Sequence, residues 1–75
     1  MLPPEIEEGN NEYKCYFKDI KNKRFTELST QMNWRLNEGN GIAYYYIGVN
    51  DDGTIFDKLS KDQIKYSLRI LNSLA

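Results

Sequence analysis

The spacing of hydrophobic positions along this chain alternates between two residues and three to four residues, which predicts alternating strands and helices. The first strand is predicted between Asn11 and Asp19, where apolar and polar side chains alternate. A period of two is typical of a strand with one buried face. The residues expected on that buried face are Tyr13, Cys15 and Phe17.

A helix is predicted next, because the apolar positions then recur every three or four residues, as in an amphipathic helix. Asn22 stands where a side-chain cap is needed at the helix start. Gly39 is placed to end the helix in a left-handed turn, which glycine adopts at low cost. The stripe expected to be buried consists of Phe25, Leu28, Met32 and Leu36.

The second strand is predicted over residues 42–49, from Ile42 to Val49, and it is apolar on both faces. A strand of this kind is typical of the centre of a sheet. The run from Asn50 to Gly53 has the composition of a hairpin turn, since Gly accepts a positive φ and Asp tolerates it. A short return strand is therefore expected from Thr54 to Phe56.

The second helix has the clearest start. Ser60 is the expected N-cap and Gln63 follows at capping-box spacing, while Leu59 and Ile64 have the spacing of a hydrophobic staple. The stripe expected to be buried is Ile64, Leu68, Leu71 and Ala75. The predicted fold class is α+β: a small three-stranded sheet with two helices on one face, in the order β-α-β-β-α. The first strand returns through a helix, so a right-handed crossover is expected if it pairs parallel to the second strand.

Composition limits what the chain can be. Its 75 residues make one small domain with a net charge of −1. Residues 1–10 contain two Pro, one Gly and three Glu, and they predict a flexible acidic lead-in to a single domain over residues 11–75. The one cysteine, Cys15, excludes an internal disulfide and indicates a reducing, cytoplasmic location. No apolar run is long enough to span a membrane.

The sequence predicts no catalytic, cofactor-binding or metal-binding residues. It has no histidine to activate Cys15 or to bind zinc, and we expect Cys15 to be a small buried side chain. Gly48 and Gly53 have the separation found in the phosphate-binding loop of GTPases. The lysine and hydroxyl residues that must follow are missing. We therefore expect this chain not to hydrolyse GTP by itself.

Two groups of residues are candidates for contact with RNA or with a protein partner. The first is basic and surrounds the start of the first helix, where the helix dipole disfavours positive charge. It is either a phosphate-binding cluster or a solvated surface with Lys23 and Glu27 one turn apart. The second is aromatic and either stacks on a partner or packs on the domain itself. The two groups are Lys18, Lys21, Lys23 and Arg24, and Trp34, Tyr44 and Tyr46.

Several short motifs, in collinear order, resemble one protein family. They are Thr30-Gln31-Met32, Trp34-Arg35-Leu36, Glu38-Gly39 with Gly41, and Ile47-Gly48-Val49 with Asp51-Asp52-Gly53. The family is the GTP-binding protein one and two group of translational GTPases, which are related to the elongation factors that deliver aminoacyl-tRNA. The resemblance implies a segment that lies N-terminal to a GTPase domain, which would hold GTP and magnesium.

The resemblance also implies partners and a longer chain. A non-catalytic accessory domain is expected to contact its own GTPase domain and either the ribosome or tRNA, in translation or in ribosome and mRNA surveillance. A further strand is expected after the second helix, so the chain is expected to be a fragment that self-associates through an open sheet edge. The residues leave two alternatives open: an autonomous RNA-binding module acting through the basic helix start, or a protein-interaction domain.

Overall fold

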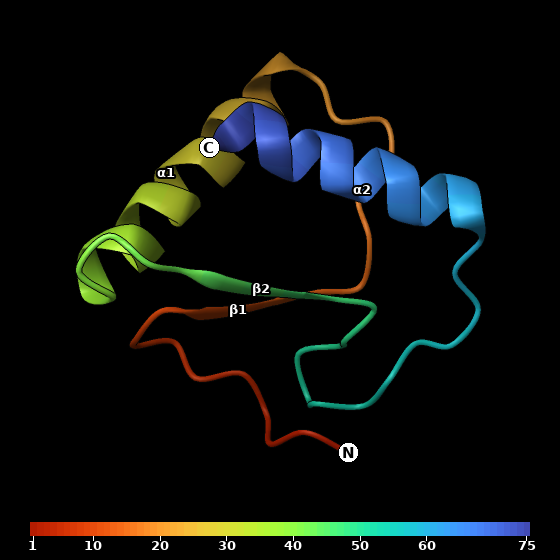
Figure 1. The fold of residues 1–75 in the computed structure, drawn as a ribbon, viewed down its shortest axis with the longest axis horizontal. Helices are drawn as coiled ribbons and strands as arrows, with labels where there is room; N and C mark the ends of the chain where they lie inside the picture. The colour runs from red at the N-terminus through yellow and green to blue at the C-terminus, as the bar shows by residue number, and fades with distance from the viewer.

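The computed structural model describes residues 1–75 and has the α+β class expected from the sequence. Its elements are, in order, strand β1 (Asn11–Lys14), helix α1 (Asn22–Glu38), strand β2 (Tyr44–Ile47) and helix α2 (Lys61–Leu74). Figure 1 shows both helices on one side of the two strands, with the first ten residues and the segment after β2 on the other side. Neither helix has the length and hydrophobicity of a membrane-spanning segment.

The two strands are parallel, as expected for strands connected through a helix. Asn11 lies opposite Tyr44 and Lys14 opposite Ile47. The Tyr44 N–H donates to the Asn10 carbonyl at 2.8 Å, one residue before β1 begins. This pairing places Glu12 beside Tyr45 on the side of the helices, and Tyr13 beside Tyr46 on the opposite side.

The three-stranded sheet and the central position of the second strand are wrong. The sheet has two strands, and the expected third strand is reduced to one antiparallel bridge between Val49 and Ile55. Gly48 ends β2 because its φ is +84°, outside the range of a strand. The hairpin turn itself is confirmed, with Gly53 at φ +89° and the Asn50 N–H donating to Thr54 O at 2.9 Å.

Helix α1 lies where it was predicted, but both of its expected caps are wrong. Lys21 is the N-cap and makes no side-chain capping hydrogen bond. At the other end Gly39 has φ −105°, and Asn40 takes the left-handed conformation at φ +54°. The Gly41 N–H then donates to Leu36 O at 2.8 Å, which is the bond of a Schellman motif. Gly39 is needed for a different reason, since a Cβ there would collide with Ile42 O.

Helix α2 has the predicted cap and a different buried face. The Gln63 N–H donates to Ser60 Oγ at 3.1 Å and the Ser60 N–H to Gln63 Oε1 at 2.8 Å, which confirms the capping box. The expected buried stripe is wrong, because Ile64 is 40% exposed and Leu68 is 52% exposed. Ser67 is the one buried residue of the helix. A sheet of two strands is too narrow to cover the whole apolar arc of α2.

The core is small and mixed in character. Leu28 and Met32 of α1 are buried as predicted, together with Tyr13, Phe17 and Val49. Cys15 is half-buried, and burial raises the pKa of its thiol. Two loop amides dock on α2, since the Phe17 N–H donates to Ser67 Oγ at 3.0 Å and the Ile20 N–H to Tyr66 Oη at 2.9 Å.

Candidate functional site

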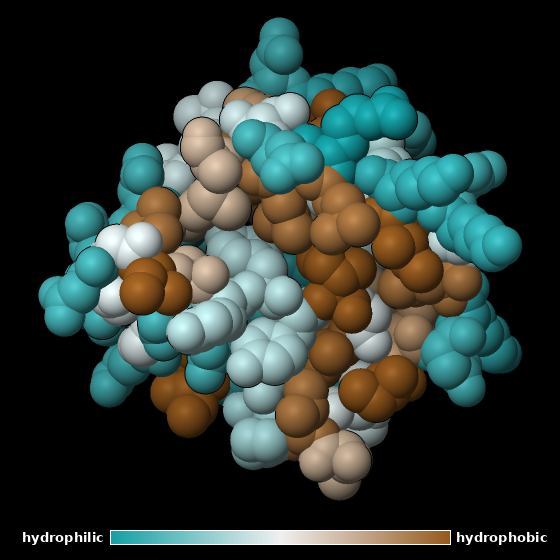
Figure 2. Space-filling model, in the orientation of Figure 1, coloured by the Kyte–Doolittle hydropathy of each residue, from teal (hydrophilic) through white to brown (hydrophobic).

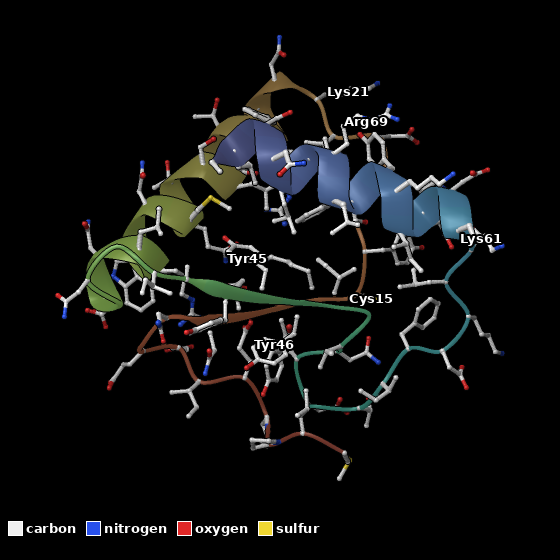
Figure 3. The ribbon with its side chains drawn as sticks, viewed as in Figure 1. Cys15, Lys21, Tyr45, Tyr46, Lys61 and Arg69 are labelled. Carbon is white, nitrogen blue, oxygen red and sulfur yellow. The ribbon has the colours of Figure 1, made fainter.

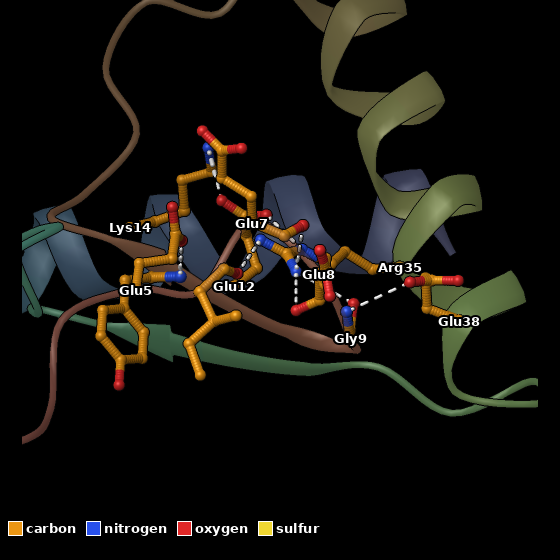
Figure 4. A network of polar contacts seen from close by, with 10 residues as sticks. Glu5, Glu7, Glu8, Gly9, Glu12, Lys14, Arg35 and Glu38 are labelled. Atoms are coloured by element: carbon orange, nitrogen blue, oxygen red, sulfur yellow. Dashed lines mark hydrogen bonds and ion pairs between the residues drawn. The ribbon is translucent and has the colours of Figure 1, made fainter.

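A charged pair lies between the sheet and helix α1 and replaces part of the expected apolar core. The Arg35 Nε–H donates to Glu12 Oε1 at 2.8 Å, and the two side chains are 4% and 2% exposed. Lys14 Nζ lies 3.2 Å from the other oxygen of Glu12. Figure 4 shows that these side chains point toward one another from β1 and α1. Buried charges persist only when they are paired and hydrogen-bonded, as these are.

The same guanidinium fixes the first residues of the chain. Arg35 Nη1 donates to the carbonyls of Glu7, Glu8 and Gly9 at 3.2, 3.1 and 2.9 Å. Its Nη2 donates to Ile6 O at 3.1 Å. Only arginine has enough donors in one plane for this set of acceptors.

Residues 1–10, expected to be a flexible lead-in, therefore have a defined place in the structure. Two backbone hydrogen bonds to the hairpin turn hold this segment in addition to Arg35. The Leu2 N–H donates to Gly53 O at 3.1 Å, and the Glu5 N–H donates to Asp51 O at 2.7 Å. The expected flexibility of residues 1–10 stays a prediction. Their hydrogen bonds show that they belong to the folded unit.

The carboxylates of this region have shifted pKa values. Burial tends to raise the pKa of Glu12, but the hydrogen bond from Arg35 and the charge of Lys14 outweigh it, so this pKa is lowered. The pKa of Glu5 is raised, mainly by burial and also by the neighbouring charge of Glu12. Glu5 Oε2 accepts the Tyr13 N–H at 2.6 Å, which partly offsets the effect of burial.

Tyr45 borders the charged pair and has an unsatisfied hydroxyl. Its Oη is buried and has no hydrogen-bond partner. Burial, with a smaller contribution from the charge of Glu12, raises the pKa of Tyr45 to about 12. The phenol is therefore neutral across the physiological range, and it places an unpaired polar atom beneath the helices.

Sequence reasoning missed Arg35 and Glu12 as a functional unit. It gave Glu12 no partner and placed Tyr13 on the buried face of the first strand. One signal could have revealed the pair, because Arg35 follows Leu28 and Met32 at the spacing of the buried helix stripe. A charged residue in that stripe requires a buried partner of opposite sign.

The four basic candidates all lie on the surface around the start of α1. Lys18, Lys21, Lys23 and Arg24 are exposed. The expected pair of Lys23 and Glu27 is not formed; Arg24 pairs with Glu27 instead, at 3.7 Å, with both side chains 54% exposed. Such an exposed pair contributes little stability. The three lysines of this surface form no ion pair.

The aromatic candidates are also exposed but lie elsewhere. Trp34 is 43% exposed, with the Arg35 guanidinium carbon 5.0 Å from its ring centroid. Tyr44 is 55% exposed, and Tyr46 is 37% exposed and stacks edge-on against Tyr13 at 5.4 Å. Figure 3 places Lys21 and Tyr46 on opposite sides of the molecule, so these two candidates do not share one surface.

An open pocket of about 220 Å³ connects the loop after β1 with the first turns of α2. It holds two carboxylates and one lysine but no cysteine or histidine. Its lining residues are Phe17, Lys18, Asp19, Asp62, Gln63 and Tyr66. The raised pKa of Cys15 keeps that thiol protonated, which makes it a poor nucleophile.

Comparison with known proteins shows what this chain is similar to. The chain is similar over nearly its whole length to proteins named for GTP binding, which confirms the resemblance to the GTP-binding protein one and two group. It is 46% identical, over 74 residues and 99% of its length, to GTP-binding protein 2 of Homo sapiens and of Mus musculus. The chain spans 12% of the length of those relatives.

A more distant relative is an uncharacterized protein of Acanthamoeba polyphaga mimivirus. The identity is 34% over 75 residues, which covers 95% of this chain and 40% of that protein. No protein-family model and no solved structure matches the chain. The comparisons therefore relate this chain to a segment of GTP-binding protein 2.

Proposed function

We propose that this chain is a non-catalytic, N-terminal accessory domain of a translational GTPase related to the elongation factors that deliver aminoacyl-tRNA. The whole protein is cytoplasmic, and it binds and hydrolyses GTP with magnesium through another domain, in translation or in ribosome or mRNA surveillance. The observation that carries the proposal is the 46% identity to GTP-binding protein 2 over 99% of this chain.

The chemistry of the described residues supports a binding role for the domain. The guanidinium of Arg35 is occupied by five hydrogen bonds, to Glu12 and to the carbonyls of residues 6–9. Glu12 is occupied by Arg35 and Lys14. The buried charges are thus used within the fold. The exposed surfaces are the parts of the domain that can contact partners. The partners we propose are the GTPase domain of the same protein and either the ribosome or tRNA.

The non-catalytic part of the proposal is tested by calorimetry. Titration of the 75-residue chain with GTP and magnesium should give no binding tighter than about 10 μM, or roughly −7 kcal/mol. Tighter binding that is competed by GDP would overturn this part. The phosphate-loop residues that such binding requires are absent from the sequence.

The accessory role is tested in human GTP-binding protein 2. The matched 74 residues are deleted in one variant and replaced by this chain in another. Both variants should bind GTP as the parent does, because nucleotide is held elsewhere. Only the replacement should sediment with ribosomes as the parent does. Equal sedimentation of the deletion variant would contradict the accessory role.

A second candidate function is RNA binding by the domain alone. The observation that favours it is the exposed basic group at the start of α1, in which Lys18, Lys21 and Lys23 form no ion pair. An exposed cluster of this kind attracts phosphates. The corresponding charge-reversal experiment is described in the Discussion.

A further inference from the structure

Strand β2 has an open edge. The N–H groups of Tyr44 and Gly48 donate to β1 or to the residue before it, at 2.8 Å each. Because backbone groups alternate between the two sides of a strand, the N–H and C=O groups of Tyr45 and Ile47 point to the other side. No strand pairs with β2 on that side, since the sheet contains only β1 and β2.

The corresponding edge of β1 is covered by the first residues of the chain. There the Tyr13 N–H donates to the Glu5 carboxylate at 2.6 Å, and the Tyr13 hydroxyl donates to the Pro3 carbonyl at 2.8 Å. Residues 1–75 thus cover one edge of the sheet and leave the other free. An uncovered edge is a template for an added strand.

Exposed apolar side chains lie on both sides of the sheet. On the side of the helices, Ile64 and Leu68 of α2 are 40% and 52% exposed. On the other side lie the exposed rings of Tyr44 and Tyr46. In Figure 1, β2 lies nearer to the viewer than β1. The open edge is therefore on the face that Figure 2 shows, where apolar side chains gather beneath α2 and beside β2.

The apolar arc of α2 is wider than its buried part. At 100° per residue, Ile70, Leu74, Leu71, Ile64 and Leu68 span about 160° of the helix. Only the part around Ser67 is packed on the domain, so the part formed by Ile64 and Leu68 has no partner. An added strand on the edge of β2 would place every second side chain toward this part of the helix.

The charges next to this arc define the chemistry of the partner. Lys61, Lys65 and Arg69 follow one another at intervals of four residues, so they form a stripe along α2 next to Leu68. None of them forms an ion pair. Carboxylates in a segment that lies along this helix therefore favour its binding, and basic residues in the segment disfavour it.

We propose that the open edge of β2 binds an extended segment of a partner protein. This segment has apolar side chains at alternate positions and carboxylates beside them. It adds a third strand through the backbone groups of Tyr45 and Ile47, and packs against Ile64 and Leu68. A second copy of this chain fits less well. Edge-to-edge pairing of two copies brings the basic stripes of two α2 helices toward one another.

The test uses a blocked eight-residue peptide in which valine alternates with threonine between two glutamates at each end. Nuclear magnetic resonance of the labelled 75-residue chain should show binding with a dissociation constant below about 1 mM. The amides of Tyr45 and Ile47 should shift and become protected from hydrogen exchange. No binding at that level, or shifts confined to the start of α1, would overturn the proposal.

Three matched comparisons separate strand addition from other association. Methylation of alternate peptide nitrogens should abolish binding, and lysine in place of glutamate should weaken it at least tenfold. Leu68→Glu should weaken binding of the acidic peptide, whereas Ile6→Glu, which changes a similarly exposed residue outside this surface, should not. Equal binding of the methylated peptide would contradict strand addition. Protection of Tyr45 and Ile47 that rises with protein concentration in the absence of peptide would instead identify a second copy as the occupant.

Discussion

Arg35 Nε lies 2.8 Å from Glu12 Oε1, and this contact joins helix α1 to strand β1 in a buried part of the domain. The same arginine holds four carbonyl groups of residues 6–9. One side chain therefore fixes three separate parts of the chain. In a small domain with five buried apolar residues, this polar contact is a major part of the tertiary structure.

We expect Arg35→Ala to lower the free energy of unfolding by about 3–5 kcal/mol, because it leaves the buried carboxylate of Glu12 without its main partner. Urea denaturation followed by circular dichroism measures the change. The double variant Glu12→Leu with Arg35→Met should be more stable than Arg35→Ala, since it removes both charges. A decrease below about 1 kcal/mol for Arg35→Ala would show that the pair is not essential.

Stability should fall in acid through Glu12. Its pKa is lowered in the folded chain, so ionised Glu12 stabilises the fold above its ordinary value of 4.5, and this stabilisation disappears as the pH falls below that value. Glu5 changes stability in the opposite direction. Its pKa is raised in the folded chain, so ionisation of Glu5 destabilises the fold as the pH rises. Urea denaturation between about pH 3 and pH 7 should show the decrease in the parent chain and a weaker decrease in Glu12→Gln. Identical pH profiles of the two chains would contradict this assignment.

Tyr45→Phe is expected to be neutral or to stabilise the fold by up to about 1 kcal/mol. The hydroxyl that it removes is buried without a partner, and such a group carries a desolvation cost of about 1–3 kcal/mol. Thermal unfolding measures the change, with Tyr44→Phe as a control at an exposed position. A clear decrease of stability in Tyr45→Phe alone would mean that the hydroxyl has a partner in solution, such as an ordered water.

Ser60→Ala should cost about 1 kcal/mol, because the alanine lacks the oxygen that accepts the Gln63 N–H. For a domain of this size that corresponds to a fall of about 4–8 °C in the melting temperature. Ser73→Ala is the matched control, since the Ser73 hydroxyl bonds only the Arg69 carbonyl on an exposed part of the helix. An unchanged melting curve for Ser60→Ala would show that the cap contributes nothing in solution.

Any RNA binding is expected to run through the basic start of α1. Reversal of Lys23 and Arg24 to glutamate should weaken binding of a labelled tRNA and flatten its salt dependence by nearly one unit for each phosphate that the protein no longer neutralises. Reversal of Lys61 and Lys65 changes the net charge equally at a different surface and is the control. If both double variants bind alike, the cluster at α1 is a solvated surface without a specific role.

The local elements of this protein are determined by its sequence, because each depends on residues close together along the chain. The capping box of Ser60 and Gln63, the turn at Gly53 and the buried positions of Leu28 and Met32 follow from spacing and backbone preference, and the structure confirms them. The sequence left the direction of strand pairing open, and the parallel pairing of β1 and β2 is the arrangement typical of strands that a helix connects. Even at this level the ends of α1 differ, because the sequence does not show that Asn40 takes the left-handed turn that glycine usually takes.

The tertiary structure alone decides which groups meet across the fold. Burial of Glu12 depends on Arg35, 23 residues later. The helix stripe indicates that Arg35 needs a buried acidic partner, but only the fold shows that this partner is Glu12. The sheet has two strands because Gly48 turns the backbone away at the end of β2, although its neighbours Ile47 and Val49 favour a strand. The exposure of Ile64 and Leu68 follows from that narrow sheet. Periodicity shows which face of a helix is apolar, whereas the area of the opposing surface decides how much of that face is buried.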